Sequence, residues 1–185
     1  QNTKFHKEKL NLISVGRLVD QKDQITLLKA VNIIKNKVDF NLVIIGDGKE
    51  KNNLLNYIYS NKLHKKVQIL SSKNDPLSMI KASDIFLLSS LYEGLPNVLL
   101  EAQVLKTYII SSNCPTGPKE ILLNGKAGSL FKVGDYKSLA NILINFSNNK
   151  RKNSKKIILG YKNLFRFDYK KNLKNYFNQI NSLME

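Results

Sequence analysis

The stretch that decides the fold is Tyr92-Glu93-Gly94-Leu95-Pro96-Asn97-Val98-Leu99-Leu100-Glu101-Ala102. Directly before it lies Asp84-Ile85-Phe86-Leu87-Leu88-Ser89-Ser90, a short apolar run that is typical of a buried strand. After Pro96 the apolar residues follow the spacing of a helix. We therefore expect Glu93 on a strand-to-helix loop and Glu101, eight residues later, inside the helix.

The loop between this strand and helix has the features of an anion site. Gly94 lets the backbone come close to a ligand, and Pro96 suits a first helical turn because its missing N–H would be unpaired there. The free N–H groups of that turn, with the helix dipole behind them, can hold an anion. Two flanking carboxylates suit a ligand that carries hydroxyls as well as phosphates. Glu101 has apolar neighbours, so we expect a buried carboxylate that needs hydroxyl or amide partners; the alternative is a solvated helix face.

Length and composition favour a folded globular domain. The 185 residues suffice for one domain or for half of a two-domain enzyme, and a hydrophobic share of 42% argues against disorder. Cys114 is the single cysteine, which excludes an internal disulfide and fits a reducing cytoplasm. No apolar run approaches the ~20 residues of a membrane-spanning helix, and the polar residues 1–10 do not resemble a signal peptide. The abrupt start at Gln1 suggests a piece excised from a longer protein.

The net charge of +16 comes almost entirely from lysine, since the only arginines are Arg17, Arg151 and Arg166. One interpretation is that the lysines reflect the codon usage of an AT-rich genome and lie on solvated faces without a binding role, because asparagine and isoleucine are abundant as well. An acidic partner such as an anionic membrane surface is the second interpretation. Nucleic acid is disfavoured, because base reading favours arginine and RNA binding favours aromatic platforms, and neither is concentrated here.

Strand and helix patterns alternate along the chain. Apolar runs predict six short strands, at 10–15, 41–45, 67–70, 85–88, 108–111 and 128–131. Helical spacing predicts helices at 23–35, after 48 to 61, from 75, 97–105, 116–122, 136–146, 150–159 and 168–184. Because short strands that are apolar on both faces indicate a parallel sheet covered on both sides, we predict a Rossmann-like, doubly wound α/β fold. Residues 1–185 are expected to form one domain, with its core at 8–150 and closing helices in 151–185.

In a doubly wound sheet the ligand lies beyond the carboxyl ends of the strands. Gly16 and Arg17 end the first predicted strand and Lys22 follows, so both cations are expected on the same edge as the glutamate loop. A guanidinium can hold phosphate through two parallel hydrogen bonds, and an ammonium acts as a point charge. The alternative is that both are ordinary surface cations. Gly46-Asp47-Gly48 lacks the last glycine of a dinucleotide fingerprint and predicts a tight turn.

Three stretches together resemble one family. They are Val15-Gly16-Arg17-Leu18 with Lys22, then Glu93–Val98 with Glu101, and then Gly117-Pro118-Lys119-Glu120-Ile121 followed by Gly128. In this order they resemble the C-terminal, donor-binding half of a GT-B glycosyltransferase of family 4. The resemblance covers about residues 8–150, and the helix at 168–184 is similar to the one that crosses back to the other domain in that fold.

The resemblance implies roles for single residues. Arg17 and Lys22 would hold the donor diphosphate, Glu93 would accept from a hydroxyl of the transferred sugar, and Glu101 would accept from the ribose hydroxyls. The amides of the glutamate loop would hold phosphate and sugar oxygens, and the loop after the third strand would meet the base. The implied catalytic residues are Arg17, Lys22 and Glu93. The implied substrate-binding residues are Gly16, Arg17, Lys22, Leu70, Ser71, Glu93, Gly94, Leu95, Pro96, Asn97, Val98 and Glu101.

The implied reaction is retaining transfer of a hexose from a nucleotide sugar, with neither a metal nor a cofactor. The stretch Ser112–Glu120 resembles members that use UDP-galactose-type or N-acetylhexosamine donors, and GDP-mannose stays open. The product would be a surface glycan such as a lipopolysaccharide or a capsule. The family's acceptor half, with its Gly-rich loop and histidine, is not in this sequence, so this piece alone should transfer nothing or nearly nothing.

Two alternatives remain at this point. A nucleotide-sugar epimerase of the same architecture would need no acceptor, but the spacing of the two glutamates argues against it. A basic module could instead rest on an anionic leaflet at the inner face of the cell membrane, with cations interleaved among apolar residues near the C-terminus. Its cations would be Arg151, Lys152, Lys155, Lys156, Lys162, Arg166, Lys170, Lys171 and Lys174, and its apolar residues Ile157, Ile158, Leu159, Tyr161, Leu164 and Phe165.

Overall fold

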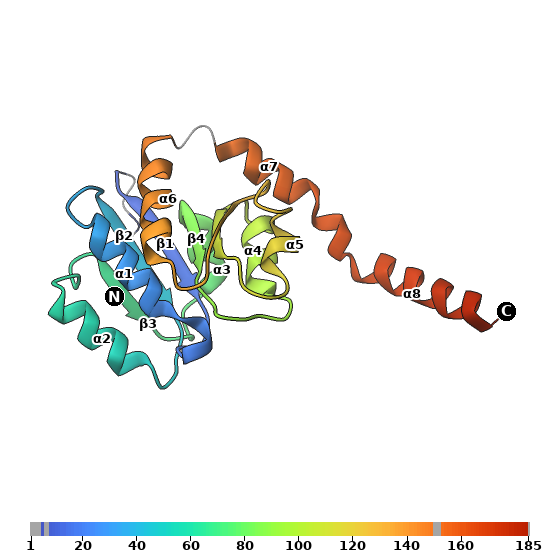
Figure 1. The fold of residues 1–185 in the computed structure, drawn as a ribbon, viewed down its shortest axis with the longest axis horizontal. Coiled ribbons are helices and arrows are strands. Elements are labelled where there is room, and N and C mark those ends of the chain that lie inside the picture. The colour runs from blue at the N-terminus through green and yellow to red at the C-terminus, as the bar shows by residue number, and fades with distance from the viewer. Residues whose placement is uncertain (1–4, 6–7, 150–152, 185) are drawn as a thin grey trace.

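The computed structural model describes residue 5 and residues 8–149 and 153–184, without the side chains of 175, 176 and 180–184. Six strands form one sheet in the order β3-β2-β1-β4-β5-β6, and every neighbouring pair is parallel (Figure 1). The strands are β1 Leu10–Val15, β2 Phe40–Ile45, β3 Val67–Leu70, β4 Ile85–Leu88, β5 Tyr108–Ser112 and β6 Ser129–Phe131. The predicted doubly wound α/β fold is confirmed, and each predicted strand is present.

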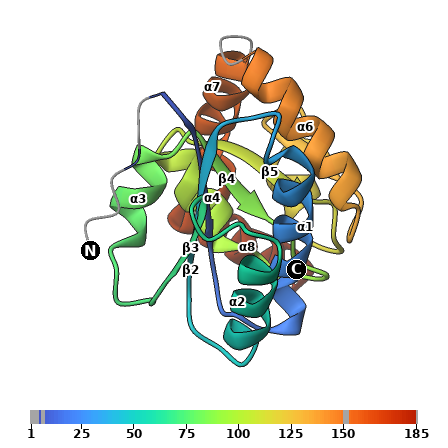
Figure 2. The ribbon, with the colours of Figure 1, turned by 90° about the vertical axis from the view of Figure 1, so that its left-hand side faces the viewer.

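Helices follow the strands in alternation and cover both faces of the sheet. They are α1 Gln24–Ile34, α2 Lys51–Ser60, α3 Pro76–Ala82, α4 Asn97–Val104, α5 Pro118–Ile121, α6 Tyr136–Asn148, α7 Ser154–Lys162 and α8 Tyr169–Met184, with short 3₁₀ turns η1 Asp20–Lys22 and η3 Leu164–Phe167. Figure 2 shows α1, α2 and α6 on one side of the sheet and α3 on the other. The two 3₁₀ turns were not predicted, and α7 ends at Lys162 rather than at Leu159.

The core consists of two apolar layers separated by the sheet. Successive residues of a strand point to opposite faces, and β1 shows this directly. Leu12 packs in the layer with α1, α2 and α6, whereas Ile13 packs in the layer with α3, α4 and α5. Both side chains are fully buried. This double burial explains why the strands are mostly apolar in sequence, and it makes their carboxyl ends a rigid edge for loops.

Short helices are held at their starts by local hydrogen bonds. Asp75 caps α3, because its carboxylate accepts from the backbone N–H groups of Leu77 at 3.1 Å and Ser78 at 3.2 Å, with Pro76 at the first helical position. This is the predicted cap. Asp135 caps α6 in the same way through Ser138 at 2.9 Å. These two caps fix where α3 and α6 begin.

The C-terminal helices lie apart from the sheet's carboxyl edge. α7 contacts α4 and β5, and Figure 1 shows α8 extending away from the rest of the molecule. Arg151 and Lys152, which were assigned to a basic surface, lie outside the described residues. Among the described helices, none is both long and apolar enough to span a membrane.

Candidate nucleotide-sugar site

The loops that follow β1 and β4 meet at the point where the strand order reverses. β1 and β4 are neighbours, and the helices after them, α1 and α4, cover opposite faces of the sheet. Two hydrogen bonds join the loops: the Leu91 N–H donates to the Gln21 carbonyl at 2.8 Å, and the Gln21 side chain donates to the Tyr92 carbonyl at 2.9 Å. The glutamate loop and the cation loop therefore share one edge, as predicted.

Lys22 and Glu93 form the centre of this edge. The Lys22 Nζ donates to the Glu93 Oε1 at 2.6 Å, and the Ser90 hydroxyl donates to the same oxygen at 2.6 Å. The side chains of Lys22 and Glu93 are only 18% and 7% exposed. Within the described residues, nothing donates to the Glu93 Oε2, and an ammonium carries three donors. The pair can therefore still offer N–H groups to an anion and one carboxylate oxygen to a hydroxyl.

Serines at the ends of β4 and β5 hold this pair in place. The Ser89 hydroxyl donates to the Lys22 carbonyl at 2.8 Å, and the Ser112 hydroxyl donates to the Ser90 carbonyl at 2.7 Å. All three serines are buried. The sequence reasoning missed these supporting roles, although paired serines at the ends of two apolar strands are a visible signal of polar groups that need buried partners.

The third family stretch supports the glutamate loop from behind. Gly117 has a φ of 85°, and a Cβ there would lie 2.4 Å from the Pro96 Cδ and 2.6 Å from the Gly94 carbonyl oxygen. Only glycine fits both the conformation and the space. The neighbouring Thr116 hydroxyl donates to the Glu93 carbonyl. This stretch thus sets the position of the loop.

The start of α4 presents unpaired backbone donors to the same edge. Pro96 is the N-cap residue, with φ −73° and ψ 88°, and its carbonyl accepts from the Leu99 N–H at 2.9 Å. The prediction that Pro96 lies in the first helical turn is therefore wrong by one residue, because its ψ is not helical. Four backbone N–H groups donate to no acceptor in the described part of the chain; they belong to Gly94, Leu95, Asn97 and Val98. With the helix dipole behind them, such donors are suited to an anion, and residues 94–98 are called the anion-binding loop below.

Arg17 supplies a second cation that is free to move. Its carbonyl accepts from the Gln24 side chain at 2.9 Å, so its backbone is fixed. The adjacent Gly16 N–H donates to the Ile45 carbonyl at 3.0 Å. The exposed Arg17 guanidinium is bonded to none of the residues that the structure describes. It can therefore turn toward an anion at the loop edge.

Glu101 is exposed, which contradicts the expectation of a buried carboxylate. The reason is its place on α4, whose buried residues are Leu99, Ala102 and Gln103, so that Glu101 faces outward. It borders a mainly apolar hollow of about 320 Å³ between α3 and α4. The hollow is lined by Leu77, Asn97, Leu100, Glu101, Val104 and Leu105. The carboxylate remains accessible to a ligand.

Leu70 and Ser71 lie at the same edge of the sheet, at the carboxyl end of β3. β3 is two strands away from β1, a separation of about 10 Å at the usual strand spacing. Both residues are half-buried. The structure thus brings Lys22, Glu93 and the anion-binding loop together. Leu70 and Ser71 lie farther along the same edge, with β2 between them and β1.

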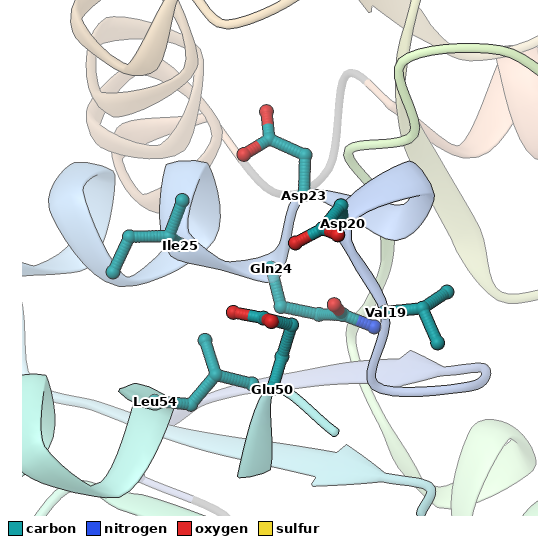
Figure 3. A pocket seen from close by; sticks show the side chains of 7 residues that line it. All are labelled: Val19, Asp20, Asp23, Gln24, Ile25, Glu50 and Leu54. Atoms are coloured by element: carbon teal, nitrogen blue, oxygen red, sulfur yellow. The ribbon is translucent and has the colours of Figure 1, made fainter. Parts of the chain in front are cut away.

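A second hollow beside the cation loop has the wrong charge for a diphosphate. Its volume is about 250 Å³, and it lies between the starts of α1 and α2 (Figure 3). It is lined by Val19, Asp20, Asp23, Gln24, Ile25, Glu50 and Leu54. In Figure 3 the Asp23 carboxylate points away from that of Glu50, and among the described residues no group of three side chains is arranged to hold a metal. Three carboxylates would repel phosphate, so this hollow does not suit the diphosphate that the sequence resemblance implies.

The comparison with known proteins decides the family. The family described as Glycosyl transferases group 1 matches residues 1–163. The chain belongs to this family. Its membership agrees with the resemblance seen in the three stretches of sequence.

Curated relatives of this glycosyltransferase family match over part of their length. An uncharacterized glycosyltransferase of Methanocaldococcus jannaschii is 38% identical over 66% of this chain and 30% of its own length. The UDP-Gal:alpha-D-GlcNAc-diphosphoundecaprenol alpha-1,3-galactosyltransferase of Escherichia coli is 36% identical over 86% of this chain and 43% of its own. The chain thus spans less than half the length of these two relatives.

Solved structures share the fold. HepE from Anabaena, solved in complex with UDP, superimposes with a TM-score of 0.84 at 20% identity, over 95% of this chain and 49% of that one. This likeness confirms the α/β architecture as one found in GT-B glycosyltransferases, of which this chain matches a part. At this level of identity it shows the fold alone.

Proposed function

We propose that this chain binds the nucleotide-sugar donor of a retaining hexosyltransferase at the edge formed by the loops after β1 and β4. The observation that carries the proposal is the Lys22–Glu93 pair, with one carboxylate oxygen unbonded within the described residues, next to a loop of unpaired N–H groups. Such a site offers cationic and N–H donors to a diphosphate and an acceptor to a sugar hydroxyl. A nucleotide sugar carries both, because its diphosphate is bonded directly to a sugar ring with free hydroxyls.

We propose a place for each part of the donor. Lys22, Arg17 and the anion-binding loop would hold the diphosphate, and the Glu93 Oε2 would accept from a hydroxyl of the sugar. Glu101, exposed on α4, would accept from the ribose hydroxyls. Ser71, about 10 Å away across β2, would lie at the base. This distance suits the extended length of a nucleoside diphosphate.

The proposed catalysis rests on charge stabilisation. When the bond between the anomeric carbon and the diphosphate oxygen breaks, its electron pair goes to the leaving diphosphate. Lys22 and the backbone N–H groups, which are already held in place, would stabilise that charge with little reorganisation, and the Arg17 guanidinium would turn toward it from its fixed backbone. No metal enters this proposal.

UDP is the nucleotide that the comparisons favour. The Escherichia coli relative takes UDP-Gal by its name, and HepE was solved with UDP. Relatives from Erwinia amylovora and Staphylococcus aureus are named for amylovoran and capsular polysaccharide biosynthesis. We therefore propose UDP-hexose or UDP-N-acetylhexosamine as donor and a surface polysaccharide or glycolipid as product.

Calorimetric titration of the chain with UDP, UDP-galactose, UDP-N-acetylglucosamine and GDP tests the proposal. UDP and at least one UDP-sugar should bind with the same stoichiometry, and GDP more weakly. Absence of binding for every nucleotide at millimolar concentration would sink the proposal. Asp39→Asn, at the opposite edge of the sheet, serves as the control that leaves binding unchanged, since Asp39 directly precedes β2.

A second proposal concerns the basic C-terminal segment, which we expect to rest on an anionic membrane surface at the cytoplasmic face. Several large apolar side chains are exposed there, including Ile158 at 52%, Tyr161 at 44% and Phe165 at 57%. Exposed lysines lie between them; they are Lys155, Lys162, Lys170, Lys171 and Lys174. From 136 to 184 the sequence contains a single acidic residue, Asp168. Each well-placed cation contributes about 1 kcal/mol on an anionic leaflet.

Some residues first assigned to this surface are used inside the molecule. Lys156 donates to the carbonyls of Gly125 at 3.1 Å and Gly128 at 2.8 Å. Arg166 donates to the Glu120 carbonyl at 3.1 Å, and Ile157 packs against the core. The surface is therefore smaller than the sequence suggests.

Co-sedimentation with vesicles tests the membrane proposal. Lys155→Glu with Lys162→Glu should release the chain from vesicles that contain anionic lipid, whereas Lys37→Glu with Lys65→Glu, exposed elsewhere, should act only through net charge and more weakly. Binding that does not depend on the anionic lipid content would contradict the proposal.

A further inference from the structure

Asp47 lies between the two parts of the proposed site. It follows the carboxyl end of β2, and β2 separates β1, which leads to the cations, from β3, which leads to the proposed base-binding loop. The turn Gly46-Asp47-Gly48 was expected to be no more than a tight turn. The structure gives Asp47 bonds to both neighbouring loops.

The Asp47 side chain holds the loop after β3. Its Oδ2 accepts from the Ser72 hydroxyl at 2.6 Å, from the Ser72 backbone N–H at 2.9 Å and from the Ser71 hydroxyl at 3.2 Å. These bonds to a carboxylate are charge-assisted and so stronger than neutral ones. They hold the pKa of Asp47 below its usual range, chiefly through the Ser72 hydroxyl and N–H, so the group stays ionised at neutral pH.

The Asp47 backbone is fixed to the cation loop. The Leu18 N–H donates to the Asp47 carbonyl at 2.9 Å, and the Glu50 N–H donates to the Leu18 carbonyl at 3.0 Å. A Cβ on Gly46 would lie 1.9 Å from the Gly16 carbonyl oxygen, and one on Gly48 would lie 2.2 Å from that of Leu18. Only glycines allow this close approach of the turn to the loop that carries Arg17.

The loop after β3 has few other attachments. β3 is an edge strand, so no strand supports the loop from its outer side. The remaining bonds of residues 71–74 stay within the loop: the Asn74 side chain and backbone N–H donate to the Ser71 carbonyl at 2.8 and 3.2 Å, and the Lys73 N–H donates to the Ser71 hydroxyl at 3.4 Å. In the described part of the chain, Asp47 is the only side chain from outside that bonds to these four residues.

We infer that Asp47 is a positioning residue for the nucleobase: it sets the place of the Ser71–Ser72 loop relative to the diphosphate-binding cations, and so contributes to the choice of base. The inference rests on the proposed function. Asp47 itself touches neither base nor phosphate. Its backbone is bound to one loop and its carboxylate to the other, so loss of the carboxylate frees the base-binding loop and leaves the cations in place.

The test compares UDP with inorganic pyrophosphate, which lacks a base, as ligands of the full chain. Asp47→Ala should weaken UDP binding roughly tenfold, as expected when two or three bonds to a charged group are lost, and should leave pyrophosphate binding within about twofold. The preference for UDP over GDP should shrink in the same variant. Asp47→Asn, whose amide oxygen can still accept, should recover part of the UDP affinity. Asp39→Ala, an exposed carboxylate at the other end of β2, is the matched control.

Amide hydrogen exchange supplies a readout of the loop itself. The Ser72 N–H should exchange faster in Asp47→Ala than in the parent chain, while exchange in β2 stays the same, which also shows that the variant is folded. Wild-type affinity of Asp47→Ala for UDP overturns this inference alone, as does an equal loss of UDP and pyrophosphate binding in both Asp47 variants. A parent chain that binds no UDP overturns the proposed function, and this inference with it.

Discussion

At the scale of single residues, the pair of Lys22 and Glu93 determines what the site can bind. Each side chain alone would be an ordinary surface charge, but the pair is mostly buried, and the Ser90 hydroxyl donates to the same Glu93 oxygen that Lys22 binds. Burial lowers the local dielectric and strengthens interactions with a bound anion. The pair also limits the flexibility of both side chains before the ligand arrives, which reduces the entropy lost on binding.

A double-mutant cycle can separate the structural role of this pair from its binding role. Lys22→Met should lower the free energy of unfolding by about 2–3 kcal/mol, because it leaves a nearly buried carboxylate without its cation. Adding Glu93→Gln should restore part of that stability, since the neutral amide needs no cation. The affinity for UDP should stay about tenfold to a hundredfold lower in both variants. Recovery of UDP affinity in the double variant would show that Lys22 does not contact the diphosphate.

The two glutamates should be distinguishable by ligand. Glu101→Ala should weaken free UDP and UDP-galactose alike, because the proposed ribose contact is common to both. Glu93→Ala should weaken UDP-galactose more than UDP, because the proposed contact is to the sugar. Calorimetry with both ligands measures the difference. Equal effects of Glu93→Ala on the two ligands would remove Glu93 from the sugar site.

Cys114 gives a prediction for pH dependence. Burial raises the pKa of its thiol above the usual range, and the nearby Glu93 charge acts in the same direction. Because the thiolate is the reactive form, the folded chain should react slowly with a thiol reagent at pH 8. The unfolded chain, whose thiol has its ordinary pKa, should react much faster at that pH. Equal rates in the two states would contradict the burial of Cys114 beneath the site.

At the scale of elements, the glutamate loop is shaped by the loop after β5. Gly117 contacts Pro96 and Gly94 so closely that no side chain fits between them. The sequence shows Gly117 only as part of a family pattern. Its contact depends on the pairing of β4 with β5, which brings the two loops together.

Gly117→Ala tests this support, with Gly125→Ala as the matched control. The two glycines have nearly the same φ, 85° and 86°, but a Cβ on Gly125 meets nothing within 4 Å. Each variant should lose about 1–3 kcal/mol of stability from backbone strain. Gly117→Ala should lose more and should also weaken UDP binding by displacing the glutamate loop. Thermal unfolding and UDP titration of both variants provide the comparison.

Most strands and helices could be predicted from the sequence, and the features that were missed have physical reasons. Strands such as β1 and β4 were placed at their observed bounds because buried parallel strands are mostly apolar and are followed by glycine or polar residues. Glu101 was misjudged because its apolar neighbours in sequence occupy other faces of α4. The bonds from Asp47 to Ser71 and Ser72 join residues 24 and 25 positions apart, so no local pattern could reveal them.

At the scale of the whole molecule, the order of the strands creates the site. β1 and β4 are far apart in sequence, yet they lie side by side because the chain returns to the middle of the sheet after β3. This reversal separates the starts of α1 and α4 and leaves the carboxyl edge open between them. The sequence indicated such a crevice because a doubly wound sheet generally has one beyond the carboxyl ends of its strands. The structure shows that Lys22 and Glu93 meet there.

Amide NMR of the labelled chain during a UDP titration shows whether a nucleoside diphosphate binds at the start of α4 beside Lys22. We expect the largest shifts at Gly94, Leu95, Asn97 and Val98, with smaller shifts at Ser71 and Ser72. The same shifts should require a roughly tenfold or higher UDP concentration in Lys22→Met. Shifts confined to other parts of the chain, such as the acidic hollow between α1 and α2, or no shifts at millimolar UDP, would contradict the account.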